Sequence, residues 1–322
     1  MKFFFHATLL ALLSPLTAAA AFLSGPDQLR AEGASFNWEQ AKARSLKILV
    51  EYRDGQMRWK RANLGSGFLI SPDGLFVTAY HVVKYCLEKQ KEISGFASPV
   101  DCSAAHPIFR YKAVSGNIES GFEVLSYLRE RDSLSGKGAQ TPDDTIKHRD
   151  FVVGRLKAGP HARFEWWPVK DFDPAAIDLS DPQADFELKP LLPPRKVFIA
   201  GYPLDEGFAI AHGFLNVTEK NRRGYFAADL KIYDPAYLET QGIAPDTRWG
   251  IRVENHMSGG AVVDAEGYVV GVLVSGDGRS AGVLSIENVL GTFFARAHDA
   301  AAPGAVFLSP TNAPLHLRRS QD

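Results

Sequence analysis

The stretch VENHMSGGAVVDAEGYVVGVLVSG, from Val253 to Gly276, combines a glycine-rich turn with two apolar runs. Small residues at Ser258-Gly259-Gly260 allow a tight turn, and the β-branched residues that follow are typical of strands joined by a short connection. The stretch therefore predicts a strand–turn–strand. Ser258 is either a nucleophile or only a small residue in a turn, and the choice depends on whether the chain also supplies a base and an acid.

Runs of β-branched and aromatic residues, separated by turn residues, recur along the chain and predict further short strands. These runs are residues 47–53, 58–70, 74–83, 150–157, 196–203, 208–218 and 224–233. Many short strands of this kind indicate an all-β sandwich or barrel. We expect residues 114–149 to be irregular, residues 168–195 to connect two halves, and short helices at 37–46 and 285–300.

The composition is that of an ordinary globular protein. The 322 residues are 45% hydrophobic, which is enough to bury the core of one large domain or two small ones. A formal net charge of −1 gives no support for a nucleic-acid-binding protein, which usually carries a basic stripe. We therefore expect no nucleic-acid partner.

The N-terminus has the layout of a secretory signal peptide. Lys2 precedes an apolar run and Ala18-Ala19-Ala20 offers a small-residue cleavage site, so residues 1–20 are expected to be removed. The alternative is an uncleaved membrane anchor, but His6 and Pro15 interrupt the apolar run and leave it too short to span comfortably. The mature protein is expected to be exported, either periplasmic or secreted, with no membrane contact after cleavage.

The chain has two cysteines, Cys86 and Cys102. In an oxidising compartment an isolated pair usually forms a disulfide, and this is our prediction. Two free buried thiols are the alternative. Neither cysteine belongs to a Cys-x-x-Cys motif, so no metal site is expected.

The stretch GSGFLISPDGLFVTAYHVV, residues 65–83, resembles a motif of the trypsin-like serine peptidases, in particular their bacterial exported branch. The motif runs Gly-Ser-Gly-Phe and then Thr-(Ala/Asn)-x-His-Val, and this chain has Gly65 to Phe68 followed by Thr78 to Val82. The resemblance implies an all-β fold of two six-stranded antiparallel β-barrels with the active site between them. It also implies that His81 is the general base, at the end of a strand. Taken on its own, this residue is better interpreted as a half-buried structural histidine.

A second match supplies the acid. Asp150-Phe151-Val152-Val153 resembles the family's orienting aspartate, which stands just before an apolar strand. Asp143 and Asp144 are alternatives. They lie in a polar stretch, where a carboxylate is more readily solvated than buried against an imidazole.

The third match returns to the opening stretch. Ser258 to Asp264 resembles the family's nucleophile motif, and Gly201-Tyr202-Pro203 resembles a strand signal upstream of it. The resemblance implies an endopeptidase that cleaves polypeptides through His81, Asp150 and Ser258, with an acyl-enzyme intermediate and no cofactor. It further implies a segment that pairs with the substrate backbone, formed by Val274, Ser275 and Gly276.

One position departs from the family pattern. By resemblance the oxyanion is bound by the backbone N–H groups of Ser258 and of the residue two before it, here His256. The family usually has glycine there because the backbone has φ > 0, which other residues adopt uncommonly. The oxyanion hole is therefore strained, formed only on substrate binding, or absent, and His256 is also placed to contact substrate. Arg252 lies where the family often has a pocket-floor residue, with an exposed structural arginine as the alternative.

Other hydrolase folds fit poorly. An α/β-hydrolase has its aspartate and histidine after the serine, and we regard the segment after Ser258 as too short for that fold. No His-Glu-x-x-His or phosphate-binding glycine motif is present. The remaining alternative is a protease-fold protein that binds a protein partner without cleaving it, and His256 is the feature that favours it.

The expected organisation is one peptidase domain. Residues 21–44 form a linker with a short helix, residues 45–300 form the domain, and residues 301–322 form a flexible tail. Within the domain, the two barrels are expected at about 45–167 and 185–295. No peptide-binding PDZ module is expected after the second barrel, and the oligomeric state is left open.

Overall fold

The computed structural model describes most of the two predicted halves. It describes residues 29–30, 33–94, 100–103, 107–127, 150–159, 162–169, 186–204, 207–221, 229–233, 256–276, 280–287, 289–290 and 293. Several predicted features lie outside these residues: the signal peptide, the tail from residue 301, Arg252, Asp143 and Asp144. No helix in the described ranges is long and apolar enough to cross a membrane.

The first half of the chain forms one antiparallel sheet of eight strands in the order β4-β7-β8-β3-β2-β1-β5-β6. These strands are β1 (Ser45–Arg53), β2 (Trp59–Leu69), β3 (Leu75–Thr78), β4 (Val100–Asp101), β5 (Phe109–Ser115), β6 (Ile118–Ser120), β7 (Phe122–Tyr127) and β8 (Val152–Leu156). The N–H of Tyr111 in β5 donates to the carbonyl of Cys102, whose own N–H donates to Phe122 in β7. These two bonds join the far strands of the sheet, so the sheet curls back on itself.

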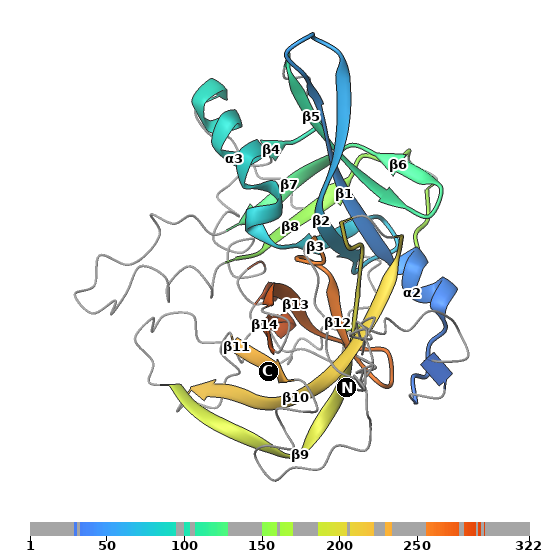
Figure 1. Ribbon diagram of the computed structural model, residues 1–322, viewed down its shortest axis with the longest axis vertical. Coiled ribbons are helices and arrows are strands. Elements are labelled where there is room, and N and C mark those ends of the chain that lie inside the picture. Colours follow the sequence, from blue (N-terminus) through green and yellow to red (C-terminus); the bar gives the residue numbers. More distant parts are fainter. Residues whose placement is uncertain are drawn as a thin grey trace, which may run out of the picture.

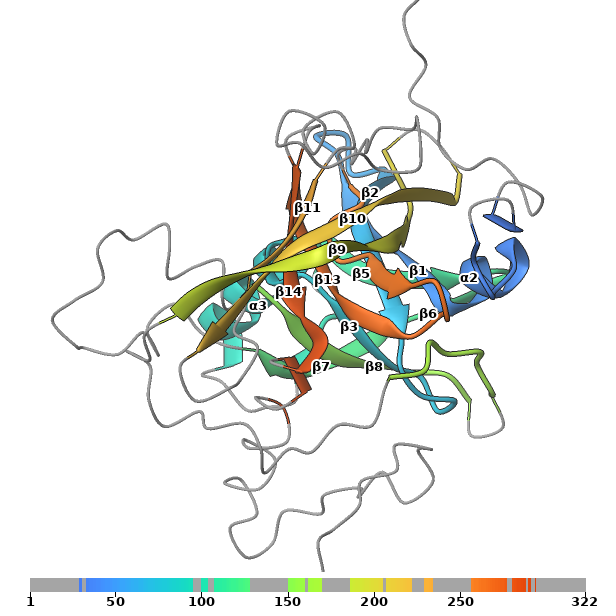
Figure 2. The ribbon, with the colours of Figure 1, turned by 90° about the horizontal axis from the view of Figure 1, so that it is seen from below.

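The second half forms a closed barrel of six strands in the order β10-β11-β14-β13-β12-β9. The strands are β9 (Phe186–Gly201), β10 (Ala209–Asn221), β11 (Asp229–Tyr233), β12 (Ala261–Asp264), β13 (Val269–Gly276) and β14 (Ser280–Ser285). Figure 1 shows this barrel below the first sheet, and Figure 2 shows the same arrangement from below. The predicted all-β class is confirmed, and the first half carries two short strands, β4 and β6, beyond the six predicted.

One hydrophobic cluster extends across both halves, and a second cluster lies within the barrel. Phe36 packs edge-to-face against Trp167 and against Phe198 of β9, with ring centroids 5.1 Å and 5.5 Å away. All three side chains are buried, and they belong to one cluster with Phe68 and Phe76 of the first sheet. Burial of aromatic rings at this junction stabilises the arrangement of the halves on which a site between them depends.

Two helices frame the first sheet. Helix α2 (Trp38–Arg44) lies within the predicted helical segment 37–46, and Asn37 and Gln40 form a capping box at its start. Helix α3 (Tyr80–Ser94) corrects the prediction that residues 74–83 form one strand, because the strand ends at Thr78. The apolar residues that follow are buried at helical spacing, since residues 82, 83, 86 and 87 share one face.

Three further predictions are corrected by the strands. Residues 114–127, expected to be irregular, contain the end of β5 and all of β6 and β7. The charged residues among them made the alternating pattern of these strands hard to recognise in the sequence. Strand β9 begins at Phe186, so the connection between the halves is shorter than the predicted 168–195. Strand β14 was not predicted, and residues 286–287, 289–290 and 293 are helical within the predicted helix 285–300.

Candidate active site

His81 and Asp150 are the first pair of predicted site residues that the structure brings together. The Nδ1 atom of His81 lies 2.6 Å from Oδ2 of Asp150, and the backbone N–H of His81 donates to Oδ1 at 2.9 Å. The Asp150 side chain is 13% exposed and the His81 side chain 45% exposed. One shielded carboxylate therefore holds both the ring and the backbone of His81, and it favours the tautomer with a proton on Nδ1 and a free lone pair on Nε2.

Strand pairing explains why these two residues meet. Strand β3 runs antiparallel to β8, and Thr78 at the end of β3 lies opposite Val152 at the start of β8. His81 follows β3 by three residues, in the first turn of α3, and Asp150 precedes β8 by two. The neighbouring ends of two paired strands thus deliver both side chains to one edge of the sheet.

The loop that carries Ser258 is held between the two halves. The carbonyl of Ser258 accepts a 2.8 Å hydrogen bond from the N–H of Ser66 in β2. On the other side, the N–H of Gly259 donates to Leu273 in β13 at 2.7 Å. Ser258 is half-buried, and its hydroxyl makes no hydrogen bond to the described residues, His81 included. Loose contacts of this kind are common before substrate binds.

Gly259 lets this loop approach the β3–α3 junction closely. It has φ +85°, and a Cβ atom there would lie 2.2 Å from the carbonyl oxygen of Ser66 and 2.9 Å from the backbone nitrogen of Ala79. No side chain fits these distances, so the backbone after Ser258 touches the backbone two residues before His81. The loop of the predicted nucleophile therefore contacts the β3–α3 junction that precedes the predicted base.

His256 adopts the backbone conformation that the family position requires. Its φ is +74°, and among the described residues the only other non-glycine residue with positive φ is Met57. No described residue accepts a hydrogen bond from the N–H of His256 or of Ser258, so both donors are left for another acceptor. The Nδ1 atom of the His256 ring is buried and has no partner among the described residues.

Ser66 is a residue whose role the sequence did not suggest. Its hydroxyl is fully buried, donates to the carbonyl of His256 at 3.0 Å and accepts from the N–H of Tyr202 at 2.8 Å. Its carbonyl accepts from the Thr78 hydroxyl at 2.6 Å. Ser66 thus connects the loop of Ser258 to both halves. The sequence feature that could have indicated this role is the position of Ser66 between two glycines in the Gly65-Ser66-Gly67 motif.

The predicted substrate-pairing segment, Val274 to Gly276, lies at the end of β13. Strand β12 pairs with β13 only as far as Val272, so this end is not covered by β12. Val274 is buried, whereas Ser275 and Gly276 are exposed. An extended chain can add to such an uncovered strand edge through backbone hydrogen bonds.

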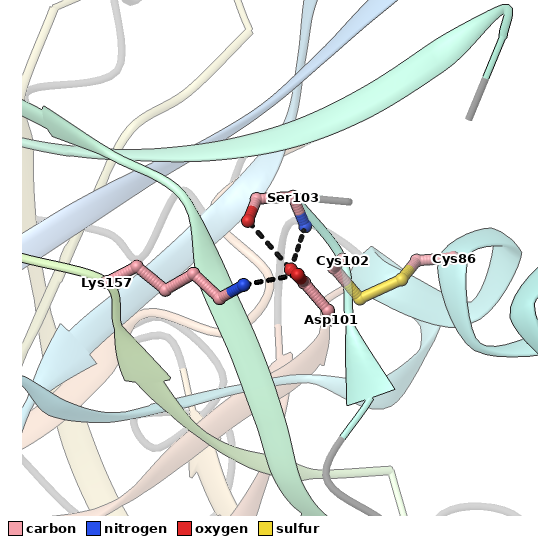
Figure 3. Close-up of a disulfide and its surroundings, with 5 residues drawn as sticks. All are labelled: Cys86, Asp101, Cys102, Ser103 and Lys157. Carbon is pink, nitrogen blue, oxygen red and sulfur yellow. Dashed lines mark hydrogen bonds and ion pairs between the residues drawn. A yellow bond between two sulfur atoms is a disulfide. The ribbon is translucent and has the colours of Figure 1, made fainter. Parts of the chain in front are cut away.

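The predicted disulfide is present between Cys86 of α3 and Cys102, with Cα atoms 5.7 Å apart (Figure 3). Figure 3 also shows Asp101 beside it, bonded to Ser103 and to the ammonium group of Lys157. Burial raises the pKa of Asp101, but the bonds from Lys157 and Ser103 outweigh it and leave the pKa below its ordinary value. Helix α3, which carries His81 in its first turn, is therefore covalently tied to the end of β4.

Three solved structures are similar to this chain at low identity. The HtrA-type protease AlgW, solved with a decapeptide, is 14% identical with a TM-score of 0.44, and the match covers 80% of this chain and 66% of AlgW, just under two thirds. Deg5 is 12% identical with a TM-score of 0.46, covering 82% and 91%. The inactive form of Rv3671c from M. tuberculosis H37Rv is 18% identical with a TM-score of 0.39, covering 82% and 90%.

The sequence itself also matches a family model. A comparison with curated proteins gives no match. The model of the trypsin-like peptidase domain matches residues 65–272, which is more than half of the chain. The match includes His81, Asp150 and Ser258. The chain therefore belongs to the family of trypsin-like serine peptidases.

Proposed function

We propose that this protein is an exported serine endopeptidase that uses Ser258 as nucleophile, His81 as general base and Asp150 as the residue that orients the base. Membership of the family supports a serine protease acting on polypeptides. The observation that carries the residue assignment is the double contact of Asp150 with the ring and the backbone of His81.

The acylation step depends on which nitrogen of His81 carries a proton. With Asp150 on Nδ1, His81 presents Nε2 as acceptor for the proton of the Ser258 hydroxyl as the oxygen attacks a peptide carbonyl. The imidazolium that forms is stabilised by the Asp150 carboxylate, which does not take the proton. His81 then donates the proton to the departing amine, and the acyl group stays on Ser258 as an ester.

Deacylation repeats these steps with water as nucleophile. In acylation and in deacylation alike, the negatively charged oxygen of the tetrahedral intermediate is bound by the N–H groups of His256 and Ser258. The positive φ of His256 and the absence of any described acceptor for these two donors support this role. Val274 to Gly276 is proposed to pair with the acyl side of the substrate.

Export is the second part of the proposal. The signal-like residues 1–20 support it, and so does the disulfide between Cys86 and Cys102, which persists in an oxidising compartment. We propose one peptidase domain at residues 45–300, with halves at about 45–167 and 185–295. The periplasm and the extracellular space both fit this proposal.

The experiment is cleavage of unfolded protein by the mature chain, with the products identified by mass spectrometry. We expect internal cuts, which terminus-blocked peptides spanning those sites reproduce, and no cuts by Ser258→Ala. Asp150→Asn is expected to retain the fold and to lower kcat by roughly 10⁴. Cuts that persist in Ser258→Ala, or removal of terminal residues only, would contradict the proposal. Folded wild-type protein that cuts nothing favours the alternative of a partner-binding protein.

A further inference from the structure

A pocket of about 650 Å³ lies on the first sheet, directly beside His256. Its walls come from β1, β2, β5 and β6, together with the segment after β9. Among the lining residues are Lys47, Arg61, Asn63, Glu119, Leu204 and His256. Leu204 is 44% exposed, which gives this pocket an accessible apolar edge. No proposed catalytic side chain lines it, although it begins two residues from Ser258.

The pocket lies on the leaving-group side of the proposed scissile bond. The Ser258 loop is bonded on one side to Leu273 of β13 and on the other to Ser66 of β2. If the acyl side of a substrate lies along Val274 to Gly276, beyond Leu273, the leaving group extends over β2. There Asn63 donates to the carbonyl of Tyr202 at 3.1 Å and holds the pocket wall in place.

The sheet surface that continues from this pocket carries an excess of positive charge. We call it the basic face, and its cations are Lys47, Arg53, Arg61, Arg110 and Lys112.

Both carboxylates of the basic face are already shared between cations. Glu51 contacts Arg61 and Arg110, each at 2.5 Å, and Glu119 contacts Arg61 at 3.0 Å and Lys112 at 3.5 Å. Lys47 and Arg53 have no carboxylate partner among the described residues. Five cations against two carboxylates leave three positive charges to attract an acidic ligand.

An exposed aromatic ring marks the far end of the basic face. Trp59, 41% exposed, has the guanidinium carbons of Arg53 and Arg110 at 5.0 Å and 4.8 Å from its ring centroid. Such stacking holds both guanidinium groups in place while leaving their N–H donors available for carboxylates. Figure 1 shows that the β1–β2 hairpin, which carries Trp59 near its tip, projects from the top of the molecule.

We propose that this pocket and the basic face bind the leaving-group side of the polypeptide substrate and select a segment that carries Asp and Glu residues. The position of the scissile bond in this inference rests on the proposed function. Asn63 and Trp59 are separated by four residues of β2, roughly 13 Å of extended chain. The selected acidic residues therefore lie about two to six positions after the scissile bond.

The first test measures binding without hydrolysis. The mature Ser258→Ala protein is titrated into a fluorescent, unstructured peptide rich in Asp and Glu, and into its Asn/Gln counterpart. We expect tighter binding of the acidic peptide, weakened by salt. Adding Lys47→Glu should weaken that binding roughly three- to tenfold, because an attraction becomes a repulsion. Lys60→Glu is the matched control, since Lys60 lies on the opposite face of β2 and should leave binding unchanged.

The second test maps cleavage of a peptide library by the wild-type protein and by Lys47→Glu. We expect Asp and Glu to be enriched after the scissile bond for the wild type only. Equal binding of the two peptides, or equal losses in the Lys47 and Lys60 variants, would overturn the inference. Cleavage without acidic preference also overturns it and leaves the proposed function intact. If Ser258→Ala binds the acidic peptide but the wild type cleaves nothing, the proposed function is wrong and the assignment of the basic face as an acidic-peptide site is supported.

Discussion

Ser66→Ala tests how the candidate oxyanion loop is held. The Ser66 hydroxyl is fully buried and joins the carbonyl of His256 to the N–H of Tyr202. Alanine removes both hydrogen bonds and changes little else in the volume of the site. The substitution leaves the part-buried carbonyl of His256 and the buried N–H of Tyr202 without this partner, and His256 itself has φ +74°.

Two effects of Ser66→Ala can be estimated from these contacts: a loss of stability and a loss of activity. The buried N–H of Tyr202 left without a partner costs about 1–3 kcal/mol and the part-buried carbonyl of His256 about 1 kcal/mol, so the free energy of unfolding should fall by about 2–4 kcal/mol. The left-handed conformation of His256 carries a further strain of about 1–2 kcal/mol, which the lost bond no longer offsets. Escape of His256 from that conformation would displace an oxyanion donor, so we expect kcat to fall roughly 10- to 100-fold with KM little changed.

The assay is a double-mutant cycle with His256→Gly, read by peptide hydrolysis and by denaturant unfolding. Glycine adopts φ > 0 without strain, so Ser66→Ala should lower kcat much less in the His256→Gly background. We expect a coupling in the activation free energy of at least about 1 kcal/mol. If the losses in activation free energy of the two single variants add to that of the double variant within about 0.5 kcal/mol, Ser66 does not hold His256 in place.

Three other changes test separate parts of the account. Gly259→Ala should abolish activity and lower the free energy of unfolding by about 3 kcal/mol, because the added Cβ would lie 2.2 Å from the carbonyl oxygen of Ser66. Gly55→Ala is the control: the space around Gly55 is open, so this variant should match the wild type in thermal unfolding. Cys86→Ser with Cys102→Ser should lower the free energy of unfolding by about 3 kcal/mol, and identical urea transitions for oxidised and reduced wild type would contradict this. Burial raises the pKa of Glu287, so the folded state loses stability as pH rises from the ordinary glutamate range through that raised pKa. Glu287→Gln should therefore have a higher Tm than wild type at pH 8 but not at pH 4, and a constant difference would contradict the assignment.

Much of the architecture was predictable because it is encoded in local patterns. The strands around Val50, Phe68 and Val272 show β-branched and aromatic runs between turn residues, and the disulfide was predicted from an isolated pair of cysteines in a chain expected to be exported. The Asp150–His81 contact followed from motif resemblance, and the structure reports its geometry.

What the sequence did not predict depends on tertiary packing. The apolar run after Thr78 reads as a strand until the buried face of α3 is known, and that face is set by contact with the sheet. The role of Ser66 depends on two partners distant in sequence, Tyr202 and His256, which lie 136 and 190 residues away. Periodicity carries no information about the contacts with Tyr202 and His256, because they form only when the two halves meet.

His256 shows where local rules conflict with the fold. A non-glycine residue at positive φ is uncommon, although histidine is among the types enriched there, and the sequence left open a strained, induced or absent oxyanion hole. In the structure the residue has φ +74°, and the Ser66 hydroxyl bonds its carbonyl. The contact that offsets the strain lies 190 residues away in the chain, beyond the reach of any local pattern.

The most direct test of the central claim is labelling of the mature protein with a fluorophosphonate probe. Such probes react with a serine only when its base and oxyanion site are assembled. We expect rapid labelling of wild type at Ser258, none of Ser258→Ala, and strongly reduced labelling of His81→Ala at unchanged thermal stability. Absence of labelling in folded wild-type protein, or labelling that persists in Ser258→Ala, would contradict it.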